Sequence, residues 1–335
     1  MQSAVLTEYN SDLTLEDRDV PEPGRGEVLI EVDACGVCHS DLHLQQGDFP
    51  MADLPVVPGH EVVGRVSEQG TGVDEPADGT PVGMPWRYTS CGRCDLCLSG
   101  REIMCSNGRV TGVTDDGGYQ EYMIAPADDV TPVPESLDPE HAAPLMCAGI
   151  TTFNGLRNGN VSPSDDVAVI GLGGLGHLGV QYADQMARRV AVLSTSPDKE
   201  DFARSLGADH FINTSHNHPG EALQEWNGGA DLVLSTAPSS EVNSAAAEGL
   251  APDGRLVLLG VTVEELEINP MLLIEGRRKV MGSPSGGRAD LRDTLQFSAE
   301  HSILPDIDTH PLDDVQDVFS QLRDGSLQGR AVLSM

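Results

Sequence analysis

The chain has 335 residues, of which 53 are acidic and 20 are Lys or Arg, so its formal net charge is −33 at pH 7. A surface of this charge repels polyanions, which excludes nucleic acid as a partner. No stretch approaches the roughly 18 uncharged apolar residues needed to span a bilayer, and no basic segment followed by an apolar run opens the chain. We therefore expect a cytoplasmic protein without membrane contact, long enough for two domains.

Nearly all of the basic residues are arginines, because Lys199 and Lys279 are the only lysines. The acidic residues are dispersed and form no acidic tail, which argues against the alternative of an acidic interaction protein. At molar ionic strength the Debye length falls to about 3 Å, so concentrated salt screens the repulsion between such charges. The composition resembles that of proteins from extreme halophiles that keep a salty cytoplasm.

The first part of the chain, residues 1–125, alternates short β-like runs such as Val28–Val32 with turns rich in Pro and Gly. This texture predicts an irregular, mostly β domain. A helical stretch is expected over about 139–156. After about residue 282 the pattern is mixed again, so the C-terminal segment is expected to return to the first domain.

Between these parts, apolar strand candidates are separated by segments of helical length. The candidates are 167–170, 190–194, 232–235 and 256–260. This alternation predicts an α/β domain with a doubly wound parallel sheet.

A glycine-rich motif follows the first of these strands and reads Gly171-Leu172-Gly173-Gly174-Leu175-Gly176. In such a motif the first two glycines allow a tight turn and close approach of a pyrophosphate, and the third lets the helix pack on the strand. Because an apolar strand precedes the motif and a helix with an apolar face follows it, we expect Gly171, Gly173, Gly174, Leu175 and Gly176 to bind a dinucleotide. A purely structural glycine turn is the alternative.

The next strand candidate ends at Ser194 and Thr195, where an NAD enzyme usually carries an acidic residue for the ribose diol. Two hydroxyls followed by Lys199 suit the 2′-phosphate of NADP(H) instead. We therefore expect NADP(H) to be preferred, with NAD(H) possible. The alternative is that the two hydroxyls form only a turn and that Lys199 is a solvated helix residue.

Four of the seven cysteines lie close together, with the spacing C-x2-C-x2-C-x7-C: Cys91, Cys94, Cys97 and Cys105. Thiols stay reduced in the cytoplasm, which disfavours disulfides. Four thiolates at this spacing predict a closed, tetrahedral structural Zn²⁺ site.

Six segments in this order carry a family resemblance: GVCHSDLH, PGHEVVG, the four-cysteine lobe, GGYQEYM, AAPLMCAGITTFNGL and GLGGLGHLGVQYA. Together they resemble the zinc-dependent alcohol dehydrogenases of the medium-chain dehydrogenase/reductase family. The resemblance implies a mostly β GroES-like catalytic domain over 1–149, with the structural lobe at 91–105. It also implies an inserted Rossmann domain over 150–282, a returning segment over 283–335, and an active site between the two domains.

The resemblance further implies a second, catalytic zinc held by Cys38, His60 and Cys147, which gives two zinc ions per subunit. Glu61 matches an exchangeable fourth ligand, and Asp41 matches the carboxylate that orients the ligand histidine.

Further residues match the coenzyme contacts and proton path of the family. Ser40 would accept the alcohol proton and pass it through the coenzyme ribose to His43. His39 and, by a weaker match, Arg330 would contact the pyrophosphate.

Three remaining candidates match no family ligand. Cys35 is expected to be a small buried thiol. His216 and His218 are expected to lie in a solvated loop rather than to bind a metal.

The resulting expectation is reversible hydride transfer between a primary alcohol or aldehyde and NADP(H) or NAD(H), in a homo-oligomer that is a tetramer or else a dimer. One alternative is a polyol or sugar dehydrogenase of the same family, whose metal sites often replace the third cysteine with a carboxylate. The other is a non-catalytic protein that binds zinc and a dinucleotide.

Overall fold

The computed structural model describes residues 1–327 and 329–335, which divide into two compact units. Unit 1 comprises Met1–Ile150 and Gly286–Met335, and unit 2 comprises Thr151–Ser285. Within the described residues, no helix is long and apolar enough to cross a membrane.

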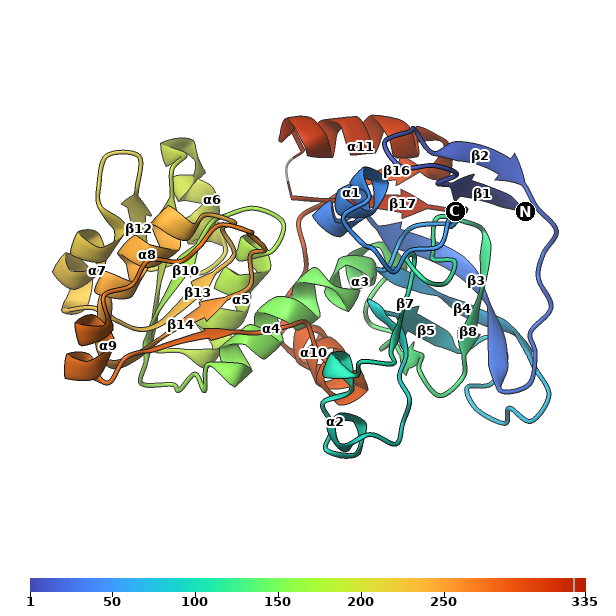
Figure 1. Cartoon of the computed structure of the whole chain (residues 1–335), viewed down its shortest axis with the longest axis horizontal. Coiled ribbons are helices and arrows are strands. Elements are labelled where there is room, and N and C mark those ends of the chain that lie inside the picture. The colour runs from blue at the N-terminus through green and yellow to red at the C-terminus, as the bar shows by residue number, and fades with distance from the viewer. Residues whose placement is uncertain (328) are drawn as a thin grey trace. The chain divides into compact units, whose positions relative to one another are not determined.

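Unit 1 is built around a seven-stranded sheet with the order β16-β17-β3-β4-β5-β9, in which β8 also pairs with β3 (Figure 1). Its strands are β3 (Glu27–Gly36), β4 (Val62–Gln69), β5 (Pro81–Met84), β8 (Tyr122–Pro126), β9 (Thr131–Pro132), β16 (Ile307–Pro311) and β17 (Arg330–Ser334). Because β17 pairs antiparallel with the end of β3, the C-terminal segment completes this sheet.

Smaller elements surround the sheet. Two small antiparallel two-stranded sheets pair β1 (Gln2–Val5) with β2 (Thr14–Asp17) and β6 (Arg87–Thr89) with β7 (Arg109–Val110). The helices are α1 (His39–Gln46), α2 (Asp95–Leu98), α3 (Pro139–Ala142), α10 (Arg288–His301) and α11 (Val315–Asp324). The amphipathic α11 buries Val318, Phe319 and Leu322 in the unit 1 core and lies beside β16 and β17 (Figure 1).

The helical stretch expected over 139–156 is not one helix. It consists of α3, a 3₁₀ turn at Ala143–Met146 and α4 (Ala148–Asn158). Pro144 has no N–H to donate to a continuous helix, and Cys147 has φ −128° and ψ −67°, outside the helical region. The interruption leaves Cys147 at a junction between two helical segments.

Unit 2 contains a six-stranded, all-parallel sheet with the order β12-β11-β10-β13-β14-β15. The strands are β10 (Asp166–Ile170), β11 (Arg189–Ser194), β12 (His210–Asn213), β13 (Ala230–Ser235), β14 (Leu250–Leu258) and β15 (Lys279–Gly282). The connecting helices are α5 (Gly176–Met186), α6 (Glu200–Ser205), α7 (Pro219–Asn227), α8 (Ser240–Glu248) and α9 (Pro270–Gly276). This strand order is that of the Rossmann fold, with its switch point between β10 and β13. The predicted fold class is therefore confirmed.

Two features of this sheet differ from the sequence-based expectation. The edge strands β12 and β15 were not predicted, because both are partly exposed and carry no continuous apolar run. Strand β14 begins at Leu250 rather than near 256, because a register shift opposite β13 and the positive φ of Asp253 interrupt its apolar pattern.

Candidate active site and metal centres

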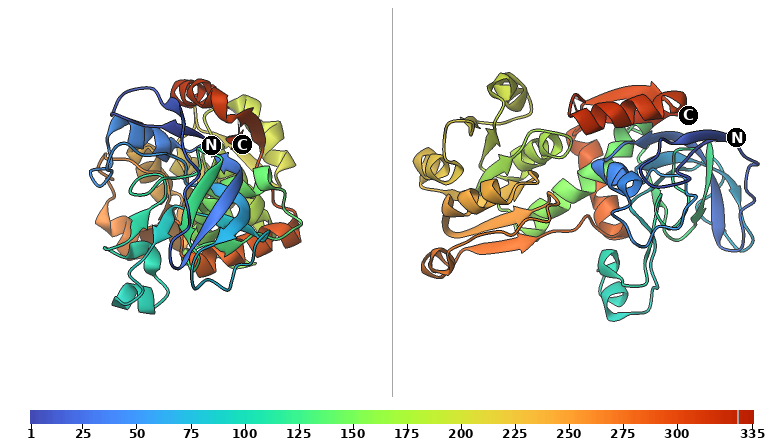
Figure 2. Two further views of the ribbon diagram at one scale, coloured as in Figure 1. Left: turned by 90° about the vertical axis from the view of Figure 1, so that its right-hand side faces the viewer. Right: turned by 45° about the horizontal axis from the view of Figure 1, so that its top comes forward.

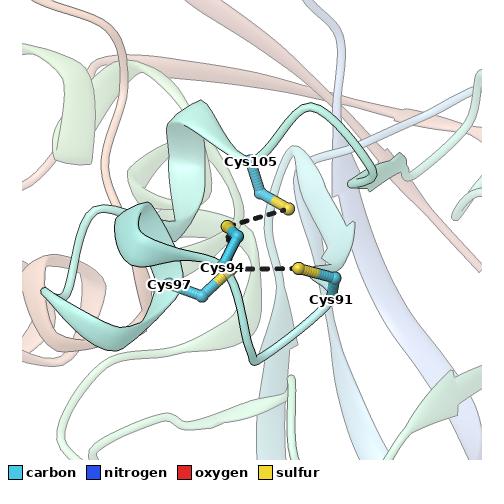
Figure 3. A group of neighbouring side chains, drawn as sticks. All are labelled: Cys91, Cys94, Cys97 and Cys105. Atoms are coloured by element: carbon cyan, nitrogen blue, oxygen red, sulfur yellow. Dashed lines mark hydrogen bonds between the residues drawn. The ribbon is translucent and has the colours of Figure 1, made fainter.

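The four cysteines of the lobe bring their sulfur atoms together, as Figure 3 shows. The Sγ atoms of Cys94 and Cys97 are 3.4 Å apart, and the Cys91–Cys97 and Cys94–Cys105 separations are both 3.9 Å. A tetrahedral zinc ion with Zn–S bonds of about 2.3 Å separates its sulfurs by about 3.8 Å. All four thiols are free, so the geometry fits a shared metal ion and not disulfides.

Local structure explains how this lobe forms. Cys94 directly precedes α2 and Cys97 lies within it, so one short helical turn positions two of the thiols. Cys105 directly follows a 3₁₀ turn at Glu102–Met104. Backbone N–H groups of Arg93 and Cys94 lower the pKa of Cys91 to about 6, which favours its thiolate. In both views of Figure 2 the lobe projects from the rest of its unit.

A second cluster lies in unit 1 and joins Cys38, His60, Glu61 and Cys147, whose candidate ligand atoms all lie within 4.8 Å of one another. Cys38 precedes α1, His60 and Glu61 directly precede β4, and Cys147 stands at the helix junction described above. Residues more than 100 positions apart in sequence thus meet at one site, where Cys38, His60 and Glu61 are buried and Cys147 is partly buried.

The donor atoms of this second cluster fit a metal ion. The Nε2 atom of His60 and the Oε2 atom of Glu61 are buried and have no hydrogen-bond partner. A hydrogen bond with Cys147 and the nearby His60 hold the pKa of Cys38 well below its usual range, against the effect of burial. Two sulfurs and one imidazole nitrogen are one of the known donor sets of catalytic zinc, which keeps a fourth position open.

Asp41 forms hydrogen bonds with two residues of this cluster, His60 and Cys38, and is only 2% exposed. Its Oδ1 atom lies 3.2 Å from Nδ1 of His60, and its Oδ2 atom accepts from the backbone N–H of Cys38 at 2.9 Å. The same Oδ2 atom accepts from the phenol of Tyr119 at 2.9 Å. The sequence assigned no role to Tyr119, because 78 residues separate it from Asp41 and only the motif GGYQEYM marked its segment.

Glu61, a member of this cluster, forms a buried ion pair with Arg330. Burial raises the pKa of Glu61 to about 7, and the charge of Arg330 opposes this rise. Arg330 is 4% exposed rather than solvated, and its Nε atom has no hydrogen-bond partner. The contact with Glu61 was not predicted for Arg330, because 269 residues separate the two in sequence.

Aromatic rings form an apolar wall beside His60. The Trp86 ring meets the imidazole edge-on at a centroid distance of 4.9 Å, and Phe49 packs against Trp86 at 5.6 Å.

The other predicted residues of unit 1 lie on or near α1. Ser40 and His43 are three residues apart on this helix, which puts them on one face. The Ser40 hydroxyl lies 3.8 Å from Sγ of Cys38, and Nδ1 of His43 lies 2.9 Å from the carboxylate of Asp48. His39 is exposed at the first position of α1.

Cys35 and the two loop histidines stand outside both clusters. Cys35 is fully buried, and burial raises the pKa of its thiol. His216 is exposed in the segment after β12, while His218 caps α7 by accepting from the N–H of Glu221 at 3.5 Å.

In unit 2, the glycine-rich motif forms the turn between β10 and α5. Gly171 has φ +88°, and a Cβ at Gly176 would lie 1.9 Å from the carbonyl oxygen of Gly171. The third motif glycine therefore packs against the turn itself; it is Gly179, one turn later, that faces strand side chains. A Cβ at Gly173 would meet nothing within 4 Å, which leaves room above the loop. The first N–H groups of α5 have no side-chain cap from Leu175, which suits a phosphate.

The candidate 2′-phosphate residues are held close to this loop. The Lys199 ammonium group donates to the Leu172 carbonyl at 3.1 Å, so Lys199 is anchored rather than freely solvated. Ser194 is largely buried and its Oγ accepts from the N–H of Ser196 at 3.2 Å, while Thr195 is exposed.

Comparison with known proteins agrees with this arrangement. Residues 24–135 match the alcohol dehydrogenase GroES-like domain, and residues 174–300 match the zinc-binding dehydrogenase domain. An alcohol dehydrogenase of Geobacillus stearothermophilus is 39% identical over 336 residues, covering 100% of both chains. The chain belongs to the zinc-binding alcohol dehydrogenases of the medium-chain dehydrogenase/reductase family. It is therefore an oxidoreductase.

Solved structures of similar fold carry either nicotinamide coenzyme. The acetophenone reductase of Geotrichum candidum in complex with NAD is 28% identical with a TM-score of 0.88. The CAD protein of Helicobacter pylori complexed with NADP(H) is 28% identical with a TM-score of 0.87. Both matches cover 100% of this chain and 97% of the other. The fold alone thus leaves the choice of coenzyme to individual residues.

Proposed function

We propose that this member of the family is an alcohol dehydrogenase that transfers hydride reversibly between a primary alcohol or aldehyde and NADP(H), which it prefers to NAD(H). The single observation that carries the proposal is the cluster of the buried Cys38 and His60 with the partly buried Cys147, in which Asp41 directs the unpartnered Nε2 of His60. We propose that these three residues hold a catalytic zinc, with Glu61 as an exchangeable ligand, and that the lobe cysteines hold a second, structural zinc.

When bound, the zinc supplies a Lewis acid for the substrate oxygen, and the nicotinamide coenzyme supplies or accepts the hydride. The residues of the chain would hold the zinc, orient its ligands and move protons. Asp41 accepts the Nδ1 proton of His60 and so keeps Nε2 as the ligand atom.

Ser40 is proposed to take the proton of the alcohol, since its hydroxyl lies beside Cys38. His43 is proposed to pass that proton to solvent, because its side chain is 43% exposed and pairs with Asp48. The apolar wall of Trp86 and Phe49 favours substrates whose carbon chain is apolar.

The coenzyme is proposed to lie on the loop Gly171–Gly176 at the switch point of the unit 2 sheet. His39 and Arg330 remain proposed pyrophosphate contacts. Ser194, Thr195 and Lys199 are proposed to recognise the 2′-phosphate, and the anchoring of Lys199 on the loop supports this role. The quaternary state is proposed to be a tetramer, or else a dimer.

The chemistry of the third ligand disfavours a polyol or sugar dehydrogenase, because the position is a cysteine, Cys147, and not a carboxylate. The direct test is a panel of alcohols and aldehydes offered with each coenzyme at high salt, followed by the absorbance of reduced coenzyme. We expect turnover of primary alcohols and aldehydes with apolar chains. A protein that binds coenzyme and zinc without any alcohol-dependent reduction would instead be the non-catalytic alternative.

A further inference from the structure

Tyr119 lies in the motif GGYQEYM and is fully buried, and its hydroxyl contacts Asp41 at the proposed active site. The phenol donates to Oδ2 of Asp41 at 2.9 Å, and Asp41 in turn meets Nδ1 of His60 at 3.2 Å. All three side chains are nearly inaccessible to solvent. Tyr119 thus contacts His60 indirectly, through a hydrogen bond to Asp41, the residue that orients this histidine.

A carboxylate can rotate about its Cβ–Cγ bond, so its orientation depends on the donors that hold each oxygen. In Asp41, Oδ2 receives the Cys38 N–H and the Tyr119 hydroxyl, and this leaves Oδ1 to face His60. We propose that Tyr119 is a positioning residue of the catalytic zinc site, whose hydroxyl fixes the Asp41 carboxylate so that His60 presents Nε2 to the metal. The inference rests on the proposed function of this cluster.

The ring of Tyr119 adds a second contact with the same site. A Cβ at Gly59, the residue before His60, would lie 2.5 Å from the Tyr119 ring, and Gly59 has φ +96°. The N–H of Tyr119 also donates to the carbonyl of Pro58 at 3.1 Å. Burial and the charge of Asp41 raise the pKa of Tyr119 well above its usual value, so the phenol remains a donor.

The substitution Tyr119→Phe removes the hydroxyl and keeps the ring, so it separates the two contacts. Zinc release from the purified protein to an excess of a coloured chelator should occur in two phases, one for each proposed site. The phase missing from Cys147→Ala identifies the cluster of Cys38, His60 and Cys147. We expect Tyr119→Phe to accelerate that phase about ten-fold and to leave zinc release from the lobe unchanged. A factor of about ten is the low end of the effect of removing a residue that supports a metal ligand by hydrogen bonding.

The matched control is Tyr122→Phe in the same motif, whose exposed hydroxyl lies 3.3 Å from Glu31. It should release both zinc ions at the wild-type rates. A Tyr119→Phe protein that only lowers Tm, with both release rates unchanged, would show that Tyr119 has a packing role and would overturn the inference.

Asp41→Asn provides the second variant. If Tyr119 acts through Asp41, the double variant should release zinc no faster than Asp41→Asn alone, whereas independent effects would multiply and contradict the inference. Should Tyr119→Phe fail to fold, an unchanged release rate in Asp41→Asn still overturns it. If Cys147→Ala keeps both phases, the proposed zinc site fails instead, so the two failures are distinguishable.

Discussion

The Nδ1 atom of His60 lies 3.2 Å from Oδ1 of Asp41, while the opposite ring nitrogen of His60 is buried without a partner. The two side chains are 1% and 3% exposed. A buried imidazole with one nitrogen engaged and the other free is costly unless the free nitrogen meets a ligand. This pair therefore links the hydrogen bonds beneath the cluster to the metal proposed within it.

The lobe should depend on its own metal. We expect Cys97→Ser to lose about one zinc per chain and to lower Tm by on the order of 5–10 °C, because a hydroxyl is a poor zinc ligand and structural zinc stabilises its fold directly. Metal analysis and thermal unfolding measure both effects. Cys35→Ser, at a cysteine outside both clusters, should keep the zinc content. Full zinc content in Cys97→Ser would contradict the closed four-thiolate site.

Concentrated salt should stabilise the protein. With a formal net charge of −33, we expect stability and activity to rise with KCl or NaCl toward molar concentrations and to fall on dialysis into dilute buffer. Unfolding curves at equal ionic strength in the two salts separate screening from the effect of a particular ion. Equal stability at low and high salt would refute the halophilic interpretation of the composition and leave the enzymology intact.

Coenzyme preference should depend on Ser194, the last residue of β11. We expect the wild type to favour NADP(H) and Ser194→Asp to shift the preference toward NAD(H), because the new carboxylate repels a 2′-phosphate and accepts from a ribose diol. The measurement is the ratio of kcat/KM for the two coenzymes at one fixed salt concentration. Ser205→Asp, an added charge on an exposed position of α6, is the control.

A wild type that favours NAD(H), or a Ser194→Asp ratio that does not move, would support the alternative that Ser194 serves only the turn. The hydrogen bond from the N–H of Ser196 to Ser194 Oγ is part of such a turn, so the experiment discriminates between the two roles.

The Rossmann unit should owe part of its stability to Asp166. Burial alone would raise the pKa of this carboxyl, but hydrogen bonds from Arg189 and Arg188 lower it to about 2. A lowered pKa contributes stability above the unfolded value of about 3.9, and this contribution disappears as the pH falls through about 2. Because both arginines are partly exposed, we expect Asp166→Asn to cost on the order of 1–2 kcal/mol at pH 7.

Chemical unfolding of wild type and Asp166→Asn between pH 7 and pH 3 checks this expectation, and the difference in free energy should shrink below about pH 4. The control is Asp253→Asn, whose ion pair with Arg277 is largely exposed and should contribute less than about 1 kcal/mol. A constant difference across the pH range would contradict the charge-based explanation.

Much of the architecture is predictable from local patterns. The inner strands β10, β11 and β13 are continuous apolar runs because helices cover both faces of a doubly wound sheet, and the glycine motif marks the turn after β10. The edge strands β12 and β15 are short and partly exposed, so periodicity does not reveal them.

The site was less accessible to sequence reasoning alone. The spacing of the four lobe cysteines predicts their metal site. Cys38, His60 and Cys147 are distant in sequence, and only the family resemblance predicted that they share a metal. The hydroxyl of Tyr119 and the ion pair of Glu61 with Arg330 depend on contacts across 78 and 269 residues, which no local pattern encodes.

The most direct test of the proposed mechanism is metal content, coenzyme binding and turnover measured together in Cys147→Ala. The substitution removes one of three proposed ligands, so we expect the catalytic zinc to be depleted and turnover to fall by more than about 100-fold. This loss exceeds the effect of removing a residue that only hydrogen-bonds a metal ligand. Coenzyme titration should remain close to wild type, because the glycine loop is untouched. Near-normal turnover in a protein with reduced zinc content would contradict the assignment of a catalytic zinc to this cluster.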